Sequence, residues 1–287
     1  MKKNRIETLL PNYRLPLDKI GSGINIVDIP FESGKRYKIE YETGKYLCMT
    51  FKEMQAESGK NIMFTEKDIT ITNIVRSIKY DKETIGEEPT FTLTDIVNIM
   101  YRGNNNKRYF EDTKKRLDFL RTTEVTIDYT DYYNELVKKD ARLDLRDITN
   151  WVINLKRERA VTNGIEHIKY TVLDTPLQFY TELTKREITV PTRDMLDGKI
   201  TNKRLGIRSY LLTRLGSKNI TEVTIEKMLV EKHIRKDPHK RYLKDIDEEV
   251  KDIAAKGLNR YENIHYRDRN NKKVSDIKDA YKISIKK

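Results

Sequence analysis

A short pattern occurs twice in this chain and constrains its fold more than any other feature. The run KRYFEDTKKRLDFL begins at Lys107, and the run KRYLKDIDEEVKDI begins at Lys240. Both have the apolar spacing of an amphipathic helix with a basic start. Each follows a shorter helix signal with a threonine as candidate N-cap, Thr94 before the first copy and Thr224 before the second. Since internal repeats fix the architecture of a chain, the two copies indicate two similar units.

A strand-prone, alternating stretch follows each repeated helix: VTIDY from Val125 and ENIHYR from Glu262. Helix, turn, helix and then β-hairpin is the element order of a winged helix. The sequence therefore predicts an α+β fold of two tandem winged-helix domains, each a helix-turn-helix plus a β-hairpin wing, with a β-rich N-terminal extension. We place the extension at residues 1–60, the first domain at residues 61–185 and the second at residues 186–287.

Two segments are candidates for the wings. In WVINLKRERAVTNGIEHIKYTVL, the dipeptide Asn163-Gly164 predicts a type I′ turn, because that turn needs positive φ at both central residues. In IHYRDRNNKKVSDIKDAYKISI, two strand-like runs lie around Asn270-Asn271. The basic residues near the two tips are Lys156, Arg157 and Arg159 in the first wing and Arg267, Arg269, Lys272 and Lys273 in the second.

Other elements flank the repeats. One helix is predicted to start near Thr65 or Asp68 and to run through IVRSIKY, and another to run through NKRLGIRSYLLTRL. The segment TPLQFYTELTK predicts a linking helix, and the stretch before the second KRY contains Pro238 and is predicted as a loop. KRYKIEYETGKYLCMTF, from Lys35, predicts two strands joined by a turn at residues 42–44. This hairpin could pack on the next domain or serve as an arm that binds a partner.

Positive charge is concentrated in the last third of the chain. Residues 186–287 contain 26 Lys and Arg against 16 Asp and Glu, which is +10 of the whole chain's net charge of +12. Ordinary basic proteins carry solvated lysines, but a bias that overlies one copy of the repeat favours a polyanionic partner. We expect this partner to be nucleic acid. A membrane is not expected as a partner, because no stretch approaches ~18 uninterrupted apolar residues.

The sequence contains no catalytic constellation, so we expect no enzymatic activity, no metal and no cofactor. The glycine fragments lack the spacing of a P-loop. The four histidines, at positions 167, 233, 239 and 265, do not form the pair around one apolar residue that a DNA-nicking relaxase uses to hold a metal. The acidic residues Asp245, Asp247, Glu248 and Glu249 have spacings suited to a solvated helix face.

Cysteine content and the first residues favour a cytoplasmic location. The lone Cys48 cannot form a disulfide within the chain or a cysteine-based zinc site. The opening MKKNRIETLL is basic but lacks the apolar core of a secretory signal.

The repeated helices are the candidate DNA readers. The second helix of a helix-turn-helix lies in the major groove, and its N-terminal residues contact base edges. Arg108 and Arg241 are the candidates for reading bases, because an arginine can bind guanine bidentately. Tyr109 and Tyr242 could contact phosphate or pack against the preceding helix, and we expect packing. The acidic stretch of the second copy must face away from DNA. The predicted DNA-binding residues are Lys107, Arg108, Lys114, Lys115, Lys156, Arg157, Arg159, Lys240, Arg241, Lys244, Arg267, Arg269, Lys272 and Lys273.

The chain resembles plasmid replication initiators that bind origin repeats, called iterons, through two winged-helix domains. LTDIVNIMY with the first KRY run is similar to the family's first helix-turn-helix, and WVINLKRERAVTNGIEHIKYTVLDTPLQFYTEL is similar to its first wing. NKRLGIRSYLLTRL, the second KRY run and the terminal strands complete the resemblance, over about residues 65–287. The resemblance implies that the C-terminal domain reads each iteron, while the N-terminal domain contacts the neighbouring backbone and supports a homodimer. It also implies recruitment of the host helicase and repression of the protein's own promoter.

The sequence thus predicts a sequence-specific, double-stranded DNA-binding replication initiator of a plasmid or phage-like element, which binds origin repeats and promotes origin opening. A winged-helix transcriptional repressor that binds a single operator is the alternative, because initiators and repressors share the fold. A DNA-nicking enzyme is a third and weaker possibility.

Overall fold

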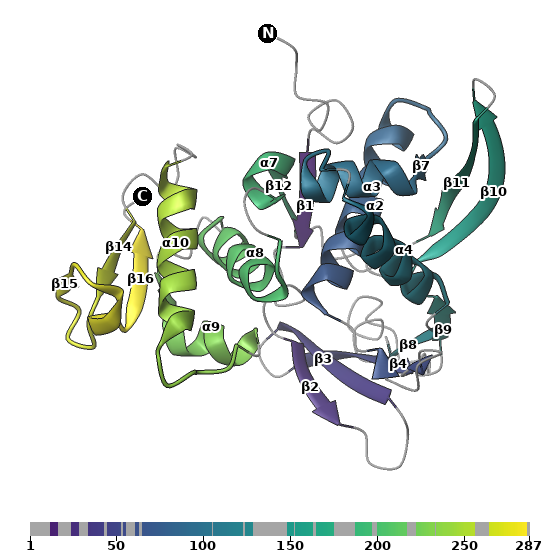
Figure 1. Ribbon diagram of the computed structural model, residues 1–287. Coiled ribbons are helices and arrows are strands. Elements are labelled where there is room, and N and C mark those ends of the chain that lie inside the picture. The colour runs from purple at the N-terminus through teal and green to yellow at the C-terminus, as the bar shows by residue number, and fades with distance from the viewer. Residues whose placement is uncertain are drawn as a thin grey trace, which may run out of the picture.

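Two units with the same order of elements are seen in the computed structural model (Figure 1). In both, a long helix is followed by a short strand, two more helices and further strands, so the predicted α+β class is confirmed. The structure describes residues 12–16, 24–28, 34–42, 45–52, 54–55, 61–62, 65–104, 106–122, 124–128, 148–151, 153–162, 165–174, 187–196, 200–216, 222–232, 234–255 and 264–285.

The first unit surrounds a helix that is buried on almost every side. In α2 (Glu66–Thr84), every residue from Thr70 to Ile78 is buried. The short strand β7 (Thr90–Thr92) pairs with β11 of the predicted hairpin, giving the strand order β10-β11-β7. The unit's remaining elements are α3 (Leu93–Tyr101), α4 (Lys107–Thr122), β10 (Asn154–Thr162) and β11 (Ile165–Asp174).

Threonines begin the helices largely as predicted, with one correction. Thr65 precedes α2 in a capping box with Asp68, and Thr224 is the N-cap of the second unit's short helix. The predicted N-cap Thr94 is wrong, because it lies inside α3. Thr92 caps this helix instead: its hydroxyl accepts a hydrogen bond from the backbone N–H of Asp95 (3.2 Å), whose carboxylate accepts the Thr92 N–H (2.8 Å).

The second unit repeats this plan. Its first helix packs on α2 and on the unit's third helix, and its sheet has the strand order β13-β16-β14-β15. The predicted loop around Pro238 separates its two later helices. The elements are α8 (Asn202–Gly216), β13 (Glu222–Thr224), α9 (Ile225–Glu231), α10 (Arg241–Ala255), β14 (Ile264–Arg267), β15 (Lys273–Val274), η1 (Ile277–Asp279) and β16 (Lys282–Ile285).

The N-terminal strands share their sheets with later parts of the chain. The predicted hairpin is present as β3 (Gly34–Glu42) and β4 (Lys45–Lys52), with β2 (Ile24–Asp28) on its outer side. β4 also pairs with β8 (Glu124–Asp128), and β8 pairs with β9 (Ile148–Trp151). Together these strands form a five-stranded sheet. β1 (Asn12–Pro16) pairs with β12 (Glu187–Pro191), which leads into α7 (Thr192–Leu196). β5 (Met54–Gln55) and β6 (Asn61–Ile62) pair with each other.

One apolar core runs through both units. It includes Ile74 of α2 and Leu120 of α4 in the first unit, and Leu211 of α8 and Ile246 of α10 in the second. Within the described residues, no helix is both long enough and apolar enough to cross a membrane. The predicted linking helix at 175–185 and the Asn163-Gly164 turn lie outside the described residues, although Thr162 stands opposite Ile165 on either side of that turn.

Candidate nucleic-acid interface

The two repeated helices begin at side chains that cap their first N–H groups. Asn106 precedes α4, and its side-chain oxygen accepts the N–H of Arg108 (2.9 Å). Asp237 precedes α10 and accepts the N–H groups of Arg241 (3.0 Å) and Tyr242 (3.3 Å). These hydrogen bonds hold the pKa of Asp237 below its usual value. Each cap fixes the direction in which the basic start of its helix points.

Lys240 stands just before α10 instead of opening it, which corrects the predicted helix start. Its backbone has a positive φ of 51°, a left-handed conformation that ends the preceding loop. The side chains of Lys240, Arg241 and Lys244 are nevertheless all exposed, so the predicted basic cluster is present at this end of the helix.

The outer face of α4 is basic and its inner face is apolar. Lys107, Arg108, Lys114 and Lys115 are exposed, while Leu117 is buried against the core. This division follows from the helical period, since residues three and four apart share a face. The four cations predicted on this helix are therefore all available on its surface.

The tyrosines of the two KRY motifs both pack, and Tyr109 does so against the preceding helix as predicted. Tyr109 stacks on Tyr101, the last residue of α3, with ring centroids 4.1 Å apart and planes inclined by 1°. Tyr242 is half-buried and packs on the hydrophobic core. These residues hold the start of each helix against the rest of its unit.

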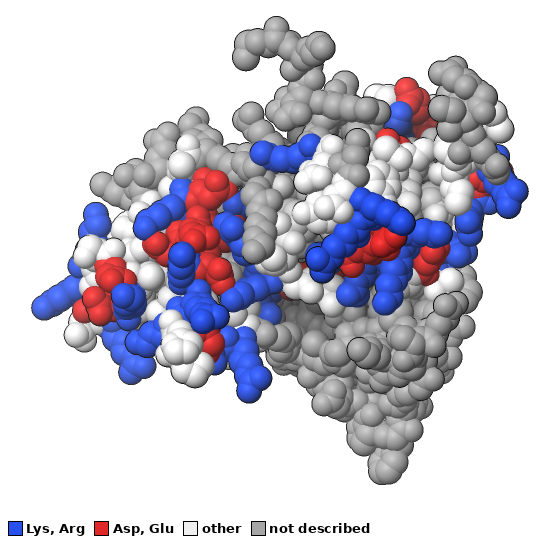
Figure 2. All heavy atoms as spheres, viewed as in Figure 1, with Lys and Arg blue, Asp and Glu red and all other residues white. Residues whose placement is uncertain are grey.

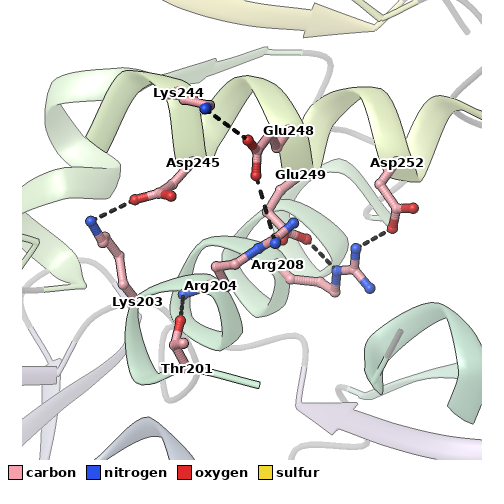
Figure 3. A network of polar contacts seen from close by, with 9 residues as sticks. All are labelled: Thr201, Lys203, Arg204, Arg208, Lys244, Asp245, Glu248, Glu249 and Asp252. Atoms are coloured by element: carbon pink, nitrogen blue, oxygen red, sulfur yellow. Dashed lines mark hydrogen bonds and ion pairs between the residues drawn. The ribbon is translucent and has the colours of Figure 1, made fainter. Parts of the chain in front are cut away.

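The acidic face of α10 is turned towards α8 (Figure 3). Glu249 is buried and bonds to Arg208 (2.5 Å) and Arg204 of α8. Lys203 binds Asp245 (2.5 Å). The expected solvated acidic face is therefore wrong for Glu249, because α8 supplies arginines that the pattern of α10 alone does not reveal. Asp245, Glu249 and Asp252 of α10 are thus paired with basic side chains of α8.

A tyrosine connects α10 to the strand that follows it. The hydroxyl of Tyr266 in β14 donates a hydrogen bond to Asp247 (2.8 Å). Burial, together with this carboxylate, strongly raises the pKa of Tyr266, so the phenol stays protonated and remains a donor. The position of α10 relative to its sheet is fixed by this contact.

The basic residues of the predicted first wing divide between the two faces of β10. Successive side chains of a strand point to opposite sides, so Arg157 and Arg159 share one face of β10 and Lys156 lies on the other. All three are exposed, and Lys156 forms an ion pair with Glu158 (2.6 Å). The structure therefore does not bring these three cations together on one surface.

In the predicted second wing, one of the four predicted cations has a structural role. Arg267 is half-buried, and its guanidinium donates to the backbone oxygen of Asn271 (2.7 Å), which closes the turn between β14 and β15. Arg269 lies over the ring of Tyr281, 5.5 Å from its centroid. Lys272 and Lys273 are exposed at the turn.

Figure 2 shows Lys and Arg side chains gathered over α4 and over the second unit around α9, on the same face of the molecule. Asp and Glu side chains gather over the upper part of α10, with cations around them, and others lie among the cations of α4. Cations of both units thus lie on one face of the molecule, a distribution suited to a polyanion.

Each repeated helix also borders a pocket that sequence reasoning missed. A pocket of about 520 Å³ at the α3–α4 turn is lined by Arg108 together with Lys67 and Arg102. A second pocket, of about 480 Å³, is lined by Lys236 and Lys240 together with Arg269 of the predicted second wing. Arg102-Gly103, both with positive φ, is a turn signal that could have drawn attention to the first pocket. Lys67 and Lys236 carry no comparable signal.

The described part of the chain contains no cluster of side chains that could bind a metal ion. No three His, Cys, Asp or Glu side chains there lie close enough together to hold a metal ion.

Comparison with known proteins identifies a fold and no family. No family model matches the sequence, and no curated protein matches it. The fold resembles domains 2 and 3 of RctB. A crystal structure of a selenomethionine derivative of these domains aligns with a TM-score of 0.55 at 12% identity, over 94% of this chain and 97% of that chain. A second crystal structure, of RctB domains 2-3 (RctB-155-483), aligns with a TM-score of 0.49 at 12% identity, over 91% and 95% of the two chains.

The first alignment extends well beyond the repeated helices. Because it covers 94% of the chain, it includes most of the N-terminal strands as well as both units. The likeness is one of architecture, since the sequences share 12% of their residues.

Proposed function

We propose that this chain is a sequence-specific, double-stranded DNA-binding protein that initiates replication of a plasmid or phage-like element. In this proposal each unit is a winged helix, with α4 and α10 in successive contacts with the major groove and the β10–β11 and β14–β15 hairpins as wings. The protein binds origin repeats and strains the adjacent DNA, and it has no catalytic activity of its own.

The observation that carries the proposal is the repeated element order. Both units contain helix, short strand, helix, helix and hairpin, and in both sheets the short strand pairs with the last strand of the unit. Winged helices use the third helix of this arrangement to enter the major groove. The exposed Arg108 and Arg241 lie at the starts of these two helices.

The role in initiation has one further support. RctB, whose domains 2 and 3 share this fold, is a replication initiator. The +10 charge of residues 186–287 favours DNA as the partner of the second unit. Recruitment of a host helicase, a homodimer and a cytoplasmic location belong to the same proposal.

Nuclease footprinting of the purified protein on DNA flanking its own gene tests the proposal. Several evenly spaced protected sites, phased near the ~10.5 bp helical repeat or its multiples, are expected for an initiator that binds repeats. One protected palindrome over the promoter would instead make the protein a repressor. Absence of protection at low salt would refute DNA binding, and metal-dependent nicking of a supercoiled plasmid would refute the non-enzymatic role.

A further inference from the structure

Three consecutive residues in the first turn of α2 contact both units of the chain. Lys67 forms an ion pair with Asp112 of α4 (2.6 Å), and Asp68 forms one with Arg116 of α4 (3.0 Å). Glu66 turns the other way and binds Lys232, which follows α9 in the second unit (3.1 Å). A single helical turn therefore holds one repeated helix and reaches into the unit of the other.

The contact with the second unit is close and largely shielded from water. The side chain of Lys232 is 2% exposed and that of Glu66 is 18% exposed. Glu66 lies over Gly206 of α8, where an added Cβ would be 3.4 Å from three atoms of the glutamate side chain. The backbone N–H of Lys67 donates to the side-chain oxygen of Asn202 at the start of α8 (3.1 Å). A buried charge such as that of Lys232 needs its partner, so this pair favours one position of the two units.

The same α8 holds the second repeated helix. Arg204 and Arg208 bind Glu249 of α10, as Figure 3 shows. Polar contacts thus join α4 to the first turn of α2, that turn to Asn202 of α8, and α8 to α10. Ion pairs and one hydrogen bond link the two candidate DNA-reading helices, in addition to the shared core.

A fixed connection between the two helices affects which spacing of DNA segments they can bind. Each inserted base pair moves the following bases by about 3.4 Å and rotates them by about 34° around the helix axis. Two reading helices held in a fixed relative position can contact two DNA segments only at one separation. A flexible connection would accept several separations.

We infer that the Glu66–Lys232 ion pair makes this chain specific for a two-part DNA site of fixed spacing. Each repeated helix binds one part, and the first turn of α2 sets the distance between them. Glu66 and Lys232 are positioning residues, because they act by joining α2 to the end of α9 and not by touching DNA. The inference rests on the proposed function, in which both helices bind DNA.

The coupling is tested first without DNA. Spin labels are attached to cysteines placed at the exposed positions Lys115 and Lys251, in a background with Cys48→Ser. The wild-type background is expected to give one narrow distance distribution, and Lys232→Met to broaden or shift it. Lys79→Met, which breaks an ion pair with Glu83 inside α2 (2.7 Å), is the control and should leave the distribution narrow. A distribution that Lys232→Met does not change overturns the coupling.

The DNA consequence is tested on duplexes in which the two halves of one footprinted site are moved apart or together by one and two base pairs. Wild type and Lys79→Met are expected to lose about tenfold or more in affinity for each altered spacing. Lys232→Met should lose about threefold or less and bind the isolated half-sites as wild type does. Glu66→Gln is the second variant, for use if Lys232→Met does not fold. Equal spacing profiles of wild type and variant overturn the inference; failure of every protein to prefer the site over random DNA refutes the proposed function, while the label distances still decide the coupling.

Discussion

Arg208 of α8 and Glu249 of α10 form an ion pair with an N–O distance of 2.5 Å, and neither side chain is more than 3% exposed. Glu249 also accepts a hydrogen bond from Arg204, and Arg208 reaches Asp252 at the next turn of α10. One carboxylate is thus shared by two guanidinium groups. Ion pairs with α8 position α10, the proposed reading helix of the second unit. In the first unit, ion pairs with α2 position the equivalent helix, α4.

Replacement of Glu249 by Gln is expected to destabilise the fold by about 3–5 kcal/mol, because it leaves two arginines beside an uncharged partner, one of them buried. Glu248→Gln, one residue away and 41% exposed, should cost about 0–1 kcal/mol. Urea denaturation followed by circular dichroism gives both free energies of unfolding. Similar losses for the two variants would contradict a special role for the buried pair.

Arg241→Ala is expected to weaken binding to the footprinted site by about 1–3 kcal/mol and to relax discrimination at one base position. The reason is that a bidentate contact with guanine is lost from the start of α10. Lys251→Ala, at an exposed position near the other end of this helix, is the control and should retain that discrimination. Equal losses on specific and random duplexes would show that Arg241 contacts only phosphate.

Affinity for DNA is expected to fall steeply with salt. If ~6–10 phosphates are neutralised, binding should weaken by ~10³–10⁵ between 50 and 200 mM salt, because condensed counterions are released. Fluorescence anisotropy titrations across this range give the slope. A flat response would argue against a polyanionic partner.

Stability is expected to decrease as pH rises through the titration of Asp68. Burial of this carboxyl group raises its pKa from 3.8 to about 6, an effect that Arg116 and Thr65 only partly offset. Between these two values the native state binds more protons than the unfolded state, so its stabilisation is present at lower pH and is lost by about pH 6. The free energy of unfolding of wild type relative to Asp68→Asn should therefore fall between pH 4 and pH 7.

The matched control is Asp95→Asn, which removes the capping carboxylate of α3. It reports the cost of losing a helix cap, since Asp95 accepts the N–H of Thr92 as Asp68 accepts that of Thr65. Parallel pH profiles of wild type and Asp68→Asn would contradict the raised pKa.

Local patterns predicted the helices well and their partners poorly. The apolar period gave α4 and α10, and the threonine signals gave the start of α2 and of α9. The N-cap Thr92 was missed, because β7 before it is only three residues long and has no period to recognise. Three residues cannot show alternation. A capping box of Thr92 with Asp95 was the signal available in the sequence.

Contacts between distant segments were not predictable from patterns. Glu249 reads as one more acidic residue on a helix, and only the arginines of α8 give it a buried partner. The pairing of β4 with β8 and of β1 with β12 depends on which edges meet in space, which hydrophobic period does not encode. The domain boundaries at residues 60 and 185 stay predictions.

β1 is a short strand with consequences for how the protein can be shortened. It pairs with β12 and also contacts α2 of the first unit and α8 of the second. Deleting the N-terminal strands, including β1 and β4, would therefore remove parts of the folded sheets. It would uncover the edges of β12 and β8, leaving rows of unpaired backbone groups that other chains can pair with. A truncated protein of this kind should aggregate, and its behaviour would say little about the intact chain.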